Sequence, residues 1–227
     1  MKSYDELKAE THFADYFANL NYSKSQLRQD LFVLSEMSFK RNGFFVEFGA
    51  TNGIDLSNTH LLEAKFGWNG ILAEPAKLWH SELLANRKAS IEIDCVWKST
   101  GETLLFNEVT GEKHKGELST IDSFSDTDNH RNSRKFGNKY EVNTISLLDL
   151  LEKYNAPKTI DYLSIDTEGS EYEILSVFDF DAFDIRVITC EHNYTPMREQ
   201  LFELLTKNGY ERKYSELSLF DDWYVRR

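Results

Sequence analysis

The chain has 227 residues, of which 41% are hydrophobic and 14% aromatic, so it can form a folded domain and is not a disordered chain. Its 26 basic and 38 acidic residues give a net charge of −12, which repels a phosphate backbone, so no nucleic-acid partner is expected. The start lacks the apolar core of a secretion signal, and no apolar run reaches the roughly 20 residues that span a bilayer. We therefore expect a cytoplasmic protein without membrane insertion.

The first 40 residues place aromatic and aliphatic side chains at helical spacing, which predicts an N-terminal helical segment (1–40) packed on the core. The remainder, 41–227, is predicted to be a single domain in which strands and helices alternate. Strands are predicted at 43–49, 70–75, 89–97, 160–166 and 185–193. Helices are predicted at 56–68, 76–87, 145–154 and 198–210, the third capped by Thr144 or Ser146. The last segments, 211–217 and 219–225, alternate like an antiparallel hairpin.

This alternation is typical of a parallel sheet covered by helices on both faces, and the terminal hairpin adds antiparallel strands at one edge. A polar insertion at about 98–140 breaks the rhythm, because it is rich in Gly, Ser, Asn and Asp and longer than an ordinary connection. A functional lid and a disordered excursion both fit such a segment. Cys95 and Cys190 lie in apolar strand-like runs and are expected to be buried free thiols.

Acidic residues end every predicted strand of the alternating region. They are Glu47, Glu74, Asp94, Asp166 and Glu191. Ligands of open parallel sheets bind at the carboxyl ends of the strands, so these side chains should share one rim. Several carboxylates on one rim repel one another and favour a cationic or polyhydroxyl ligand.

The turn after the first strand, "VEFGATNG", tests for a dinucleotide site. A pyrophosphate cradle needs G-x-G-x-x-G, but Thr51 stands where the second glycine would be, and Glu47 would repel the phosphates. S-adenosylmethionine has no phosphate and carries an ammonium and a sulfonium, so an acid there is favourable. Glu74 is suited to accept hydrogen bonds from the ribose hydroxyls, and Asp94 and Cys95 fall where the adenine would lie.

The blocks "GFFVEFGATNGIDLSNTHLLEAKFGWNGILAEP" and "TIDYLSIDTEGSEYEIL" resemble the FkbM family of S-adenosylmethionine-dependent methyltransferases. The segments "SQLRQDLFVL", "VITCEHN", "NGYERKY" and "DDWYV" are in keeping with it, so the resemblance runs from about residue 23 to the end. It implies a class I methyltransferase fold, which is an α/β, Rossmann-like, seven-stranded mixed sheet flanked by helices. It also implies methyl transfer, most often to a hydroxyl of a sugar, in a cell-surface polysaccharide or a natural product.

The resemblance places Glu47, Gly49 and Asn52 on the first cofactor loop and Glu74 at the ribose. Together with the strand-end argument, the residues predicted to bind the cofactor are Glu47, Gly49, Ala50, Thr51, Asn52, Glu74, Pro75, Asp94, Cys95 and Asp166. Catalytic roles are predicted for the fourth and fifth strand ends, at Asp166, Glu168, Glu171 and His192. A hydroxyl is a weak nucleophile that needs a base or a divalent cation. Asp166, Glu191 and His192 form a candidate metal site, with Mg²⁺ suited to the two carboxylates and His192 better suited to act as a base.

Other assignments stay open at this point. Ser170 and Glu173 form an S-x-x-E capping box, so Glu173 is expected to cap a helix and face solvent. Gln26, Gln29 and Asp30 either reach the methionine end of the cofactor or form a solvated helix face. Alternative functions are an N-methyltransferase for a small amine-bearing metabolite, a nucleotide-sugar oxidoreductase or epimerase, and a sugar-binding module without activity. The sequence leaves the oligomeric state open, with a dimer as one option.

Overall fold

The structure is a computed structural model that describes residues 4–111 and 116–227, without the side chains of residues 4–11. Its largest element is a seven-stranded sheet with the strand order β10-β11-β9-β8-β1-β2-β3. The strands are β1 (Phe44–Phe48), β2 (Asn69–Ala73), β3 (Ser90–Glu92), β8 (Thr159–Ile165), β9 (Asp184–Glu191), β10 (Tyr210–Lys213) and β11 (Asp221–Arg226). Neighbours from β3 to β9 pair in parallel, whereas β11 pairs antiparallel with both β9 and β10, which confirms the terminal hairpin.

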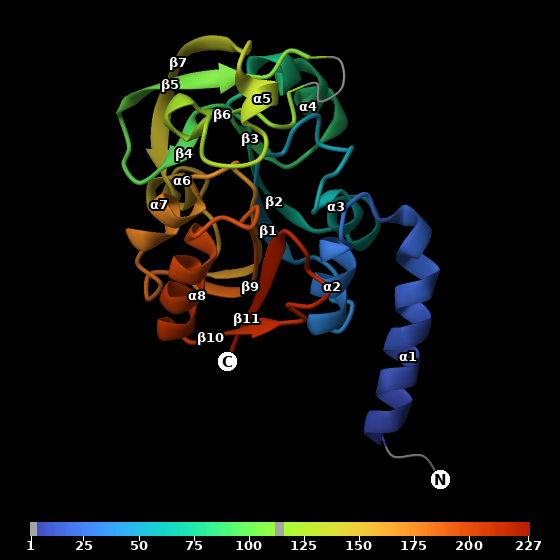
Figure 1. The fold of residues 1–227 in the computed structure, drawn as a ribbon. Coiled ribbons are helices and arrows are strands. Elements are labelled where there is room, and N and C mark those ends of the chain that lie inside the picture. Colours follow the sequence, from blue (N-terminus) through green and yellow to red (C-terminus); the bar gives the residue numbers. More distant parts are fainter. Residues whose placement is uncertain (1–3, 112–115) are drawn as a thin grey trace.

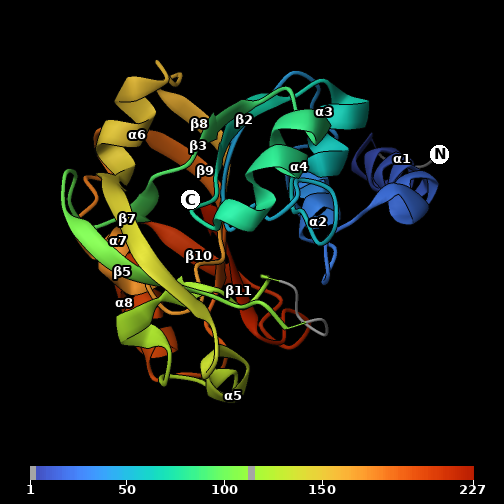
Figure 2. The ribbon, with the colours of Figure 1, turned by 90° about the horizontal axis from the view of Figure 1, so that it is seen from above.

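Helices cover both faces of this sheet (Figures 1 and 2). One face is covered by α2 (Gln29–Glu36), α3 (His60–Phe66) and α4 (His80–Asn86), the last preceded by the 3-10 turn η2 (Lys77–Trp79). The other is covered by α6 (Leu147–Lys153), α7 (Glu171–Ser176) and α8 (Met197–Lys207). Helix α1 (Tyr4–Asn19) and the turn η1 (Leu20–Tyr22) lie outside α2. None of the described helices has both the length and the apolar composition that crossing a bilayer requires.

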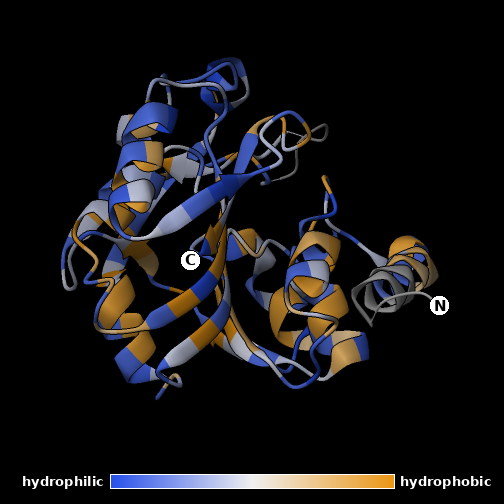
Figure 3. Ribbon diagram, turned by 90° about the horizontal axis from the view of Figure 1, so that it is seen from below, coloured by the Kyte–Doolittle hydropathy of each residue, from blue (hydrophilic) through white to orange (hydrophobic). Residues whose placement is uncertain are grey.

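The core follows from the alternation of side chains along each strand. On β1, Phe45 packs with Leu31 and Leu62 of the first helical layer, while Val46 and Phe48 face Leu150 and the second layer. Hydrophobic colour accordingly concentrates where the helices meet the sheet in Figure 3. Both faces of the strands are therefore used for packing, and their polar chemistry is left to the strand ends.

The polar insertion forms a second sheet, with the order β4-β7-β5-β6. Its elements are β4 (Cys95–Trp97), β5 (Thr103–Glu108), β6 (Thr120–Ile121), the turn η4 (Asp122–Phe124), α5 (Arg131–Arg134) and β7 (Asn138–Ser146). Trp97, Phe106, Ile121 and Val142 give this sheet a small core of its own. The described part of the insertion is thus a packed unit and not a disordered excursion.

The prediction of a single strand over 89–97 is wrong. A carboxylate oxygen of Glu92 accepts hydrogen bonds from the backbone N–H groups of Ile93 and Asp94, at 2.9 and 3.1 Å. The chain turns there, so that β3 pairs with β2 while β4 leaves for the second sheet and pairs with β7. The periodicity of the sequence did not reveal this break because the residues on both sides are apolar.

The two capping predictions have opposite outcomes. Ser146 caps α6 as predicted, since its side chain accepts a hydrogen bond from the backbone N–H of Asp149 at 3.1 Å. The capping box at α7 is wrong, because the Ser170 hydroxyl donates to Thr167 Oγ1 at 2.8 Å and makes no cap. Glu173 instead lies 3.0 Å from Lys98 Nζ, an ion pair that joins α7 to the second sheet.

Candidate active site

A cavity of about 280 Å³ lies at the carboxyl ends of β1, β2, β8 and β9, and the second sheet forms its cover. Phe106, Leu118 and Ile121 of the inserted segment line the cavity on the side of this cover. Of the predicted site residues, it is lined by Glu47, Gly49, Thr51, Glu74, Pro75, Cys95, Asp166, Glu168 and Glu191. Four of the five strand-end acids, Glu47, Glu74, Asp166 and Glu191, therefore line one cavity, as the strand-end rule predicted.

Glu47 is the penultimate residue of β1 and is 2% exposed. Its two carboxylate oxygens accept hydrogen bonds from Ser57 Oγ (3.0 Å), the Asn58 backbone N–H (2.6 Å) and Thr59 Oγ1, and Arg87 Nη1 lies 3.8 Å away. The carboxylate thus fixes the segment that carries Asn58. Burial raises the pKa of Glu47, and the Arg87 charge opposes that rise. Contact between Glu47 and a cofactor stays a prediction.

Gly49 forms the turn after β1, with φ at +74°. A Cβ atom at this position would lie 2.0 Å from the backbone oxygen of Asp166. Only glycine permits this conformation together with so close an approach. The turn therefore brings the end of β1 against the end of β8, where Asp166 follows the strand.

Glu74 directly follows β2 and orders two loops by accepting hydrogen bonds from their backbone. One oxygen accepts a hydrogen bond from the Thr51 backbone N–H and the other from that of Ala76, both at 2.8 Å. Burial raises the pKa of Glu74 to about 7, and these hydrogen bonds oppose the rise. A carboxylate oxygen can accept more than one hydrogen bond, and Glu74 lines the cavity, so the binding of ribose hydroxyls by Glu74 stays a prediction.

Three residues predicted to bind the cofactor lie outside the cavity wall. Ala50 is buried in the core beside α2 and α3. Asn52 uses its side chain to close its own turn, accepting from the backbone N–H groups of Ile54 and Asp55. Asp94 stands at the turn between β3 and β4 instead of at a strand end of the main sheet. The neighbouring Cys95 does line the cavity, and burial raises its pKa to about 12, so the thiol is neutral.

Asp166, Glu168 and Glu191 bring one carboxylate oxygen each within 4.8 Å of one another. Asp166 follows β8, Glu168 lies two residues further on, and Glu191 ends β9. Burial raises the pKa of Asp166 to about 7. Burial, followed by the charge of Asp166, raises the pKa of both Glu168 and Glu191. We call these three residues the carboxylate cluster; it can share protons near neutral pH or hold a divalent cation.

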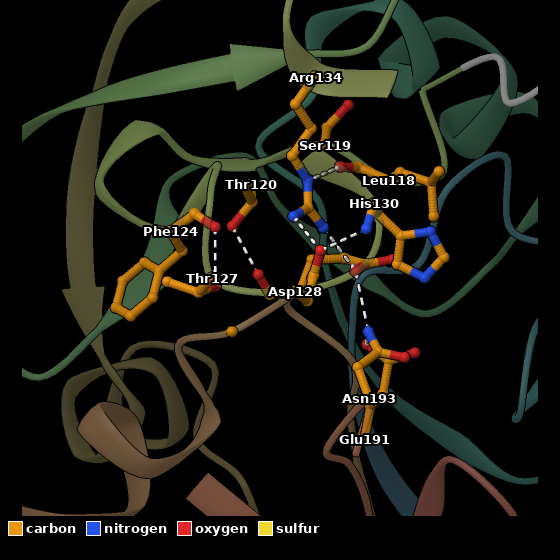
Figure 4. Close-up of polar contacts among 12 residues, drawn as sticks. Leu118, Ser119, Thr120, Phe124, Thr127, Asp128, His130, Arg134, Glu191 and Asn193 are labelled. Atoms are coloured by element: carbon orange, nitrogen blue, oxygen red, sulfur yellow. Dashed lines mark hydrogen bonds and ion pairs between the residues drawn. The ribbon is translucent and has the colours of Figure 1, made fainter. Parts of the chain in front are cut away.

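Arg134 ties the inserted segment to the carboxylate cluster. This residue of α5 is 0% exposed, and its guanidinium lies 2.8 Å from both Asp128 Oδ1 and Glu168 Oε2. Its Nε donates to the Leu118 backbone oxygen, also at 2.8 Å. Figure 4 shows Arg134 pointing from the cover toward Asp128, with Asn193 on the opposite side. Buried ion pairs of Arg134 therefore hold the cover against the carboxylate cluster.

Two predicted catalytic residues lie beside this cluster without joining it. The Glu171 carboxylate accepts hydrogen bonds from the backbone N–H groups of Thr167 (2.9 Å) and Gly169 (3.1 Å), so it shapes the loop between β8 and α7. His192 Nδ1 accepts from the Tyr194 backbone N–H at 3.0 Å, and Nε2 lies 3.9 Å from Asp222 Oδ1. Burial lowers the pKa of His192, which keeps the ring neutral. In the candidate metal site Glu168 stands in the place predicted for His192.

Asn58 and Arg134 were not predicted as site residues, and Asn193 was expected only as the neighbour of the Glu191–His192 pair. Asn58 lines the cavity, is 7% exposed, and its Oδ1 is without a hydrogen-bond partner among the described residues. The Asn193 side-chain amide donates hydrogen bonds to Glu168 Oε2 at 3.1 Å and to Glu191 Oε2 at 2.8 Å. Arg134 joins the cover to the cluster through its ion pairs with Asp128 and Glu168. Asn58 could have been found from its position in "LSNTHLLE", where polar residues stand before a helix. Arg134 gave no signal because the insertion has no readable pattern.

The segment before β1 contributes one residue to the cavity. Gln26 lines it, and its contact with the methionine end of the cofactor stays a prediction. Gln29 instead donates to Asp221 Oδ2 at 2.7 Å, and Asp30 accepts from Ser23 Oγ at 2.6 Å. Both side chains are buried, so neither forms a solvated helix face.

The strand order of the main sheet, with β11 antiparallel between β9 and β10 and a cavity beyond the glycine turn, defines a class I methyltransferase. The family model of the methyltransferase FkbM domain matches residues 47–217. The chain therefore belongs to this family of methyltransferase domains. S-adenosylmethionine is the methyl donor that this fold and family imply. The oxidoreductase and epimerase alternatives have no support.

Solved structures with a similar course of the chain include methyltransferases. An assigned RNA methyltransferase from Pyrococcus horikoshii is 12% identical with a TM-score of 0.37, over 82% of this chain and 66% of its own. The structure of the fibrillarin/Nop5p complex is 12% identical with a TM-score of 0.38, over 82% of this chain and 73% of its own. A protein of Galdieria sulphuraria, assigned as a sarcosine dimethylglycine methyltransferase, is 11% identical with a TM-score of 0.36, over 83% of this chain and 63% of its own.

The matched part thus spans slightly less than two thirds of the first and third of these chains. No curated protein matches the sequence significantly. The fold assignment rests on the strand order and the family model.

Proposed function

We propose that the protein is an S-adenosylmethionine-dependent O-methyltransferase whose acceptor is a hydroxyl of a sugar or glycoside. The observation that carries this proposal is the carboxylate cluster, which lies at the far end of the cavity from Glu74 along the strand order. A hydroxyl loses a proton when it is methylated, and a carboxylate with a pKa near 7 is suited to accept it. A neutral amine needs less assistance of this kind, so the cluster favours O-transfer over N-transfer.

The residues of the cavity fit S-adenosylmethionine, which supplies an activated methyl group when bound. The unpartnered Oδ1 of buried Asn58 offers an acceptor for an ammonium group, and Gln26 lies on the same wall. Glu74 offers acceptors for the ribose hydroxyls. Val96 and Pro75 form an apolar wall near the end of β2, which suits an adenine ring. These assignments account for the acid that follows β2 and for a buried amide oxygen that would otherwise lack a partner.

The carboxylate cluster has two roles to offer. Without a cation, burial keeps part of its protons bound near neutral pH, and Asp166 is the proton acceptor of choice because its pKa is raised to about 7. The donor set of three carboxylates also fits Mg²⁺, which prefers oxygen ligands. A cation there would lower the pKa of the acceptor hydroxyl and fix its position. Asp166, Glu168 and Glu191 would hold it, with His192 outside the set.

The test combines labelled cofactor with mass spectrometry. The protein is incubated with S-adenosylmethionine carrying a deuterated methyl group and a pool of glycosides and small amines. A gain of one labelled methyl on a glycoside, lost in Asp166→Asn, supports the proposal. Labelling of amines alone would replace it by N-methyl transfer. Full turnover after exhaustive chelation would remove the cation and leave proton acceptance by the cluster.

A further inference from the structure

A second pocket of about 220 Å³ lies next to the first cavity, between α7, α8 and the turn η4 of the inserted segment. Part of its wall is apolar or aromatic: Phe124, Tyr172, Pro196 and Met197. Gln200, Thr127 and Thr195 add neutral polar groups. The wall therefore combines apolar surface with polar groups, as a site for a small molecule does.

The two pockets meet at the carboxylate cluster. Glu191 and Asn193 line both of them. The Asn193 amide donates to Glu191 and Glu168, and so spans the boundary between the pockets. A molecule in the second pocket can therefore present a hydroxyl to the cluster while the first cavity holds another ligand.

We propose that the second pocket binds the methyl acceptor, and that this acceptor is a neutral or amino-bearing glycoside without a phosphate or carboxylate group. The inference rests on the proposed function and narrows its substrate class. It excludes sugar phosphates and nucleotide sugars, although both are common carriers of sugar hydroxyls.

The charge of the pocket supports this exclusion. The charged side chains on its wall are Asp128, Glu171, Glu173 and Glu191, and none of the described lining residues is a lysine or an arginine. The nearby cations are already engaged, Arg134 with Asp128 and Glu168 and Lys98 with Glu173. A phosphate would meet several carboxylates without a free countercharge, and like charges in close contact are strongly unfavourable.

The size of the pocket is compatible with a sugar ring. Its volume of about 220 Å³ offers room for one such ring. The faces of Phe124 and Tyr172 offer apolar surface for the C–H groups of such a ring. The remainder of a larger glycoside would lie outside the pocket.

The experiment first measures binding of S-adenosylhomocysteine by calorimetry, because failure there would end the proposed function itself. With that ligand saturating, ligand-observed NMR then measures the affinity of phenyl β-D-glucoside, phenyl β-D-glucosaminide and phenyl β-D-glucoside 6-phosphate. The neutral and amino probes should bind, and the 6-phosphate should bind at least tenfold more weakly than its neutral parent. Absence of binding by both uncharged and amino probes, or equal binding of the phosphate, overturns the inference.

Variants of the pocket wall locate the binding. Met197→Trp should lower the affinity for the neutral probe at least fivefold. Glu203→Trp, on the exposed side of the same helix, should leave that affinity unchanged. Because Met197 also packs on the core, Gln200→Trp at an exposed position of the wall is the second blocking variant. Unaltered affinity in both blocking variants, when folded, overturns the assignment.

A charge reversal tests the electrostatic argument. Glu173→Lys should raise the affinity for the 6-phosphate probe at least threefold relative to Glu203→Lys, which makes the same change of net charge away from the pocket. Equal affinities in the two variants would overturn the role of charge in acceptor selection.

Discussion

Replacing Arg134 by Met removes the buried cation that joins the cover to the carboxylate cluster. The side chain is 0% exposed and lies 2.8 Å from both Asp128 and Glu168, so the variant leaves two buried carboxylates without a countercharge. Breaking a buried ion pair in this way costs about 3–5 kcal/mol. That is a large part of the roughly 5–15 kcal/mol by which a domain is stable.

Urea unfolding followed by tryptophan fluorescence measures the loss, since Trp79 and Trp97 both pack in the core of the inserted segment. With an m value of about 2 kcal/mol/M, the midpoint should fall by about 1.5–2.5 M. Arg131→Met, at an exposed position of the same short helix, is the matched control and should change stability by less than about 0.5 kcal/mol. A loss in Arg134→Met no greater than in the control would refute the reasoning.

A second substitution separates charge from packing. Adding Glu168→Gln to Arg134→Met removes one of the stranded carboxylates and should recover part of the lost stability, which a double-mutant cycle would detect. Lower pH should act in the same direction. Burial already raises the pKa of Glu168, so its protonation as pH falls relieves the repulsion and narrows the gap between Arg134→Met and the parent protein.

Other predictions concern the first cavity and its rim. Glu74→Ala should weaken S-adenosylmethionine binding more than tenfold in calorimetry, whereas Asp94→Ala, outside the cavity wall, should stay within twofold; equal affinities would contradict the cofactor assignment. Gly49→Ala should lower thermal stability by about 2 kcal/mol or more, because its Cβ meets Asp166, while Gly101→Ala, also at positive φ but in open space, should cost about 1 kcal/mol. Methyl transfer should rise with pH through about 7 as Asp166 deprotonates, and a profile flat from pH 6 to 8 would argue against Asp166 as the base.

The sequence predicted the fold well because the pattern of each strand and helix is local. Apolar runs such as 160–166 and 185–193 became β8 and β9, and the acids that end them stand at the cavity as expected. The second sheet was not predictable. Its strands pair residues from distant parts of the chain, such as Thr103 with Asn143, and its polar composition gave no periodicity.

The site was predicted to the level of residue type at strand ends, and the roles of single residues required contacts. Glu171 and Glu168 are equivalent in the sequence block "SIDTEGSE". In the structure the first is bound by backbone N–H groups and the second by Arg134. Arg134 comes from a segment 34 residues earlier, so no local pattern could have assigned it to Glu168.

A rim of buried acids raises the question of how the fold tolerates it, and the partners of each acid give the answer. Backbone N–H groups bind Glu74, and hydroxyls, an N–H group and Arg87 bind Glu47, so these two carboxylates hold loops in place. Asp166 and Glu191 are kept close to Glu168, and among the described residues one guanidinium, that of Arg134, pairs with this cluster; burial raises the pKa of each of the three. A group whose pKa is raised by folding stabilises the native state at low pH, and that stability is lost as pH rises through the raised value. The pH range in which the cluster can accept a proton is therefore the range in which it destabilises the fold, as expected where activity and stability compete.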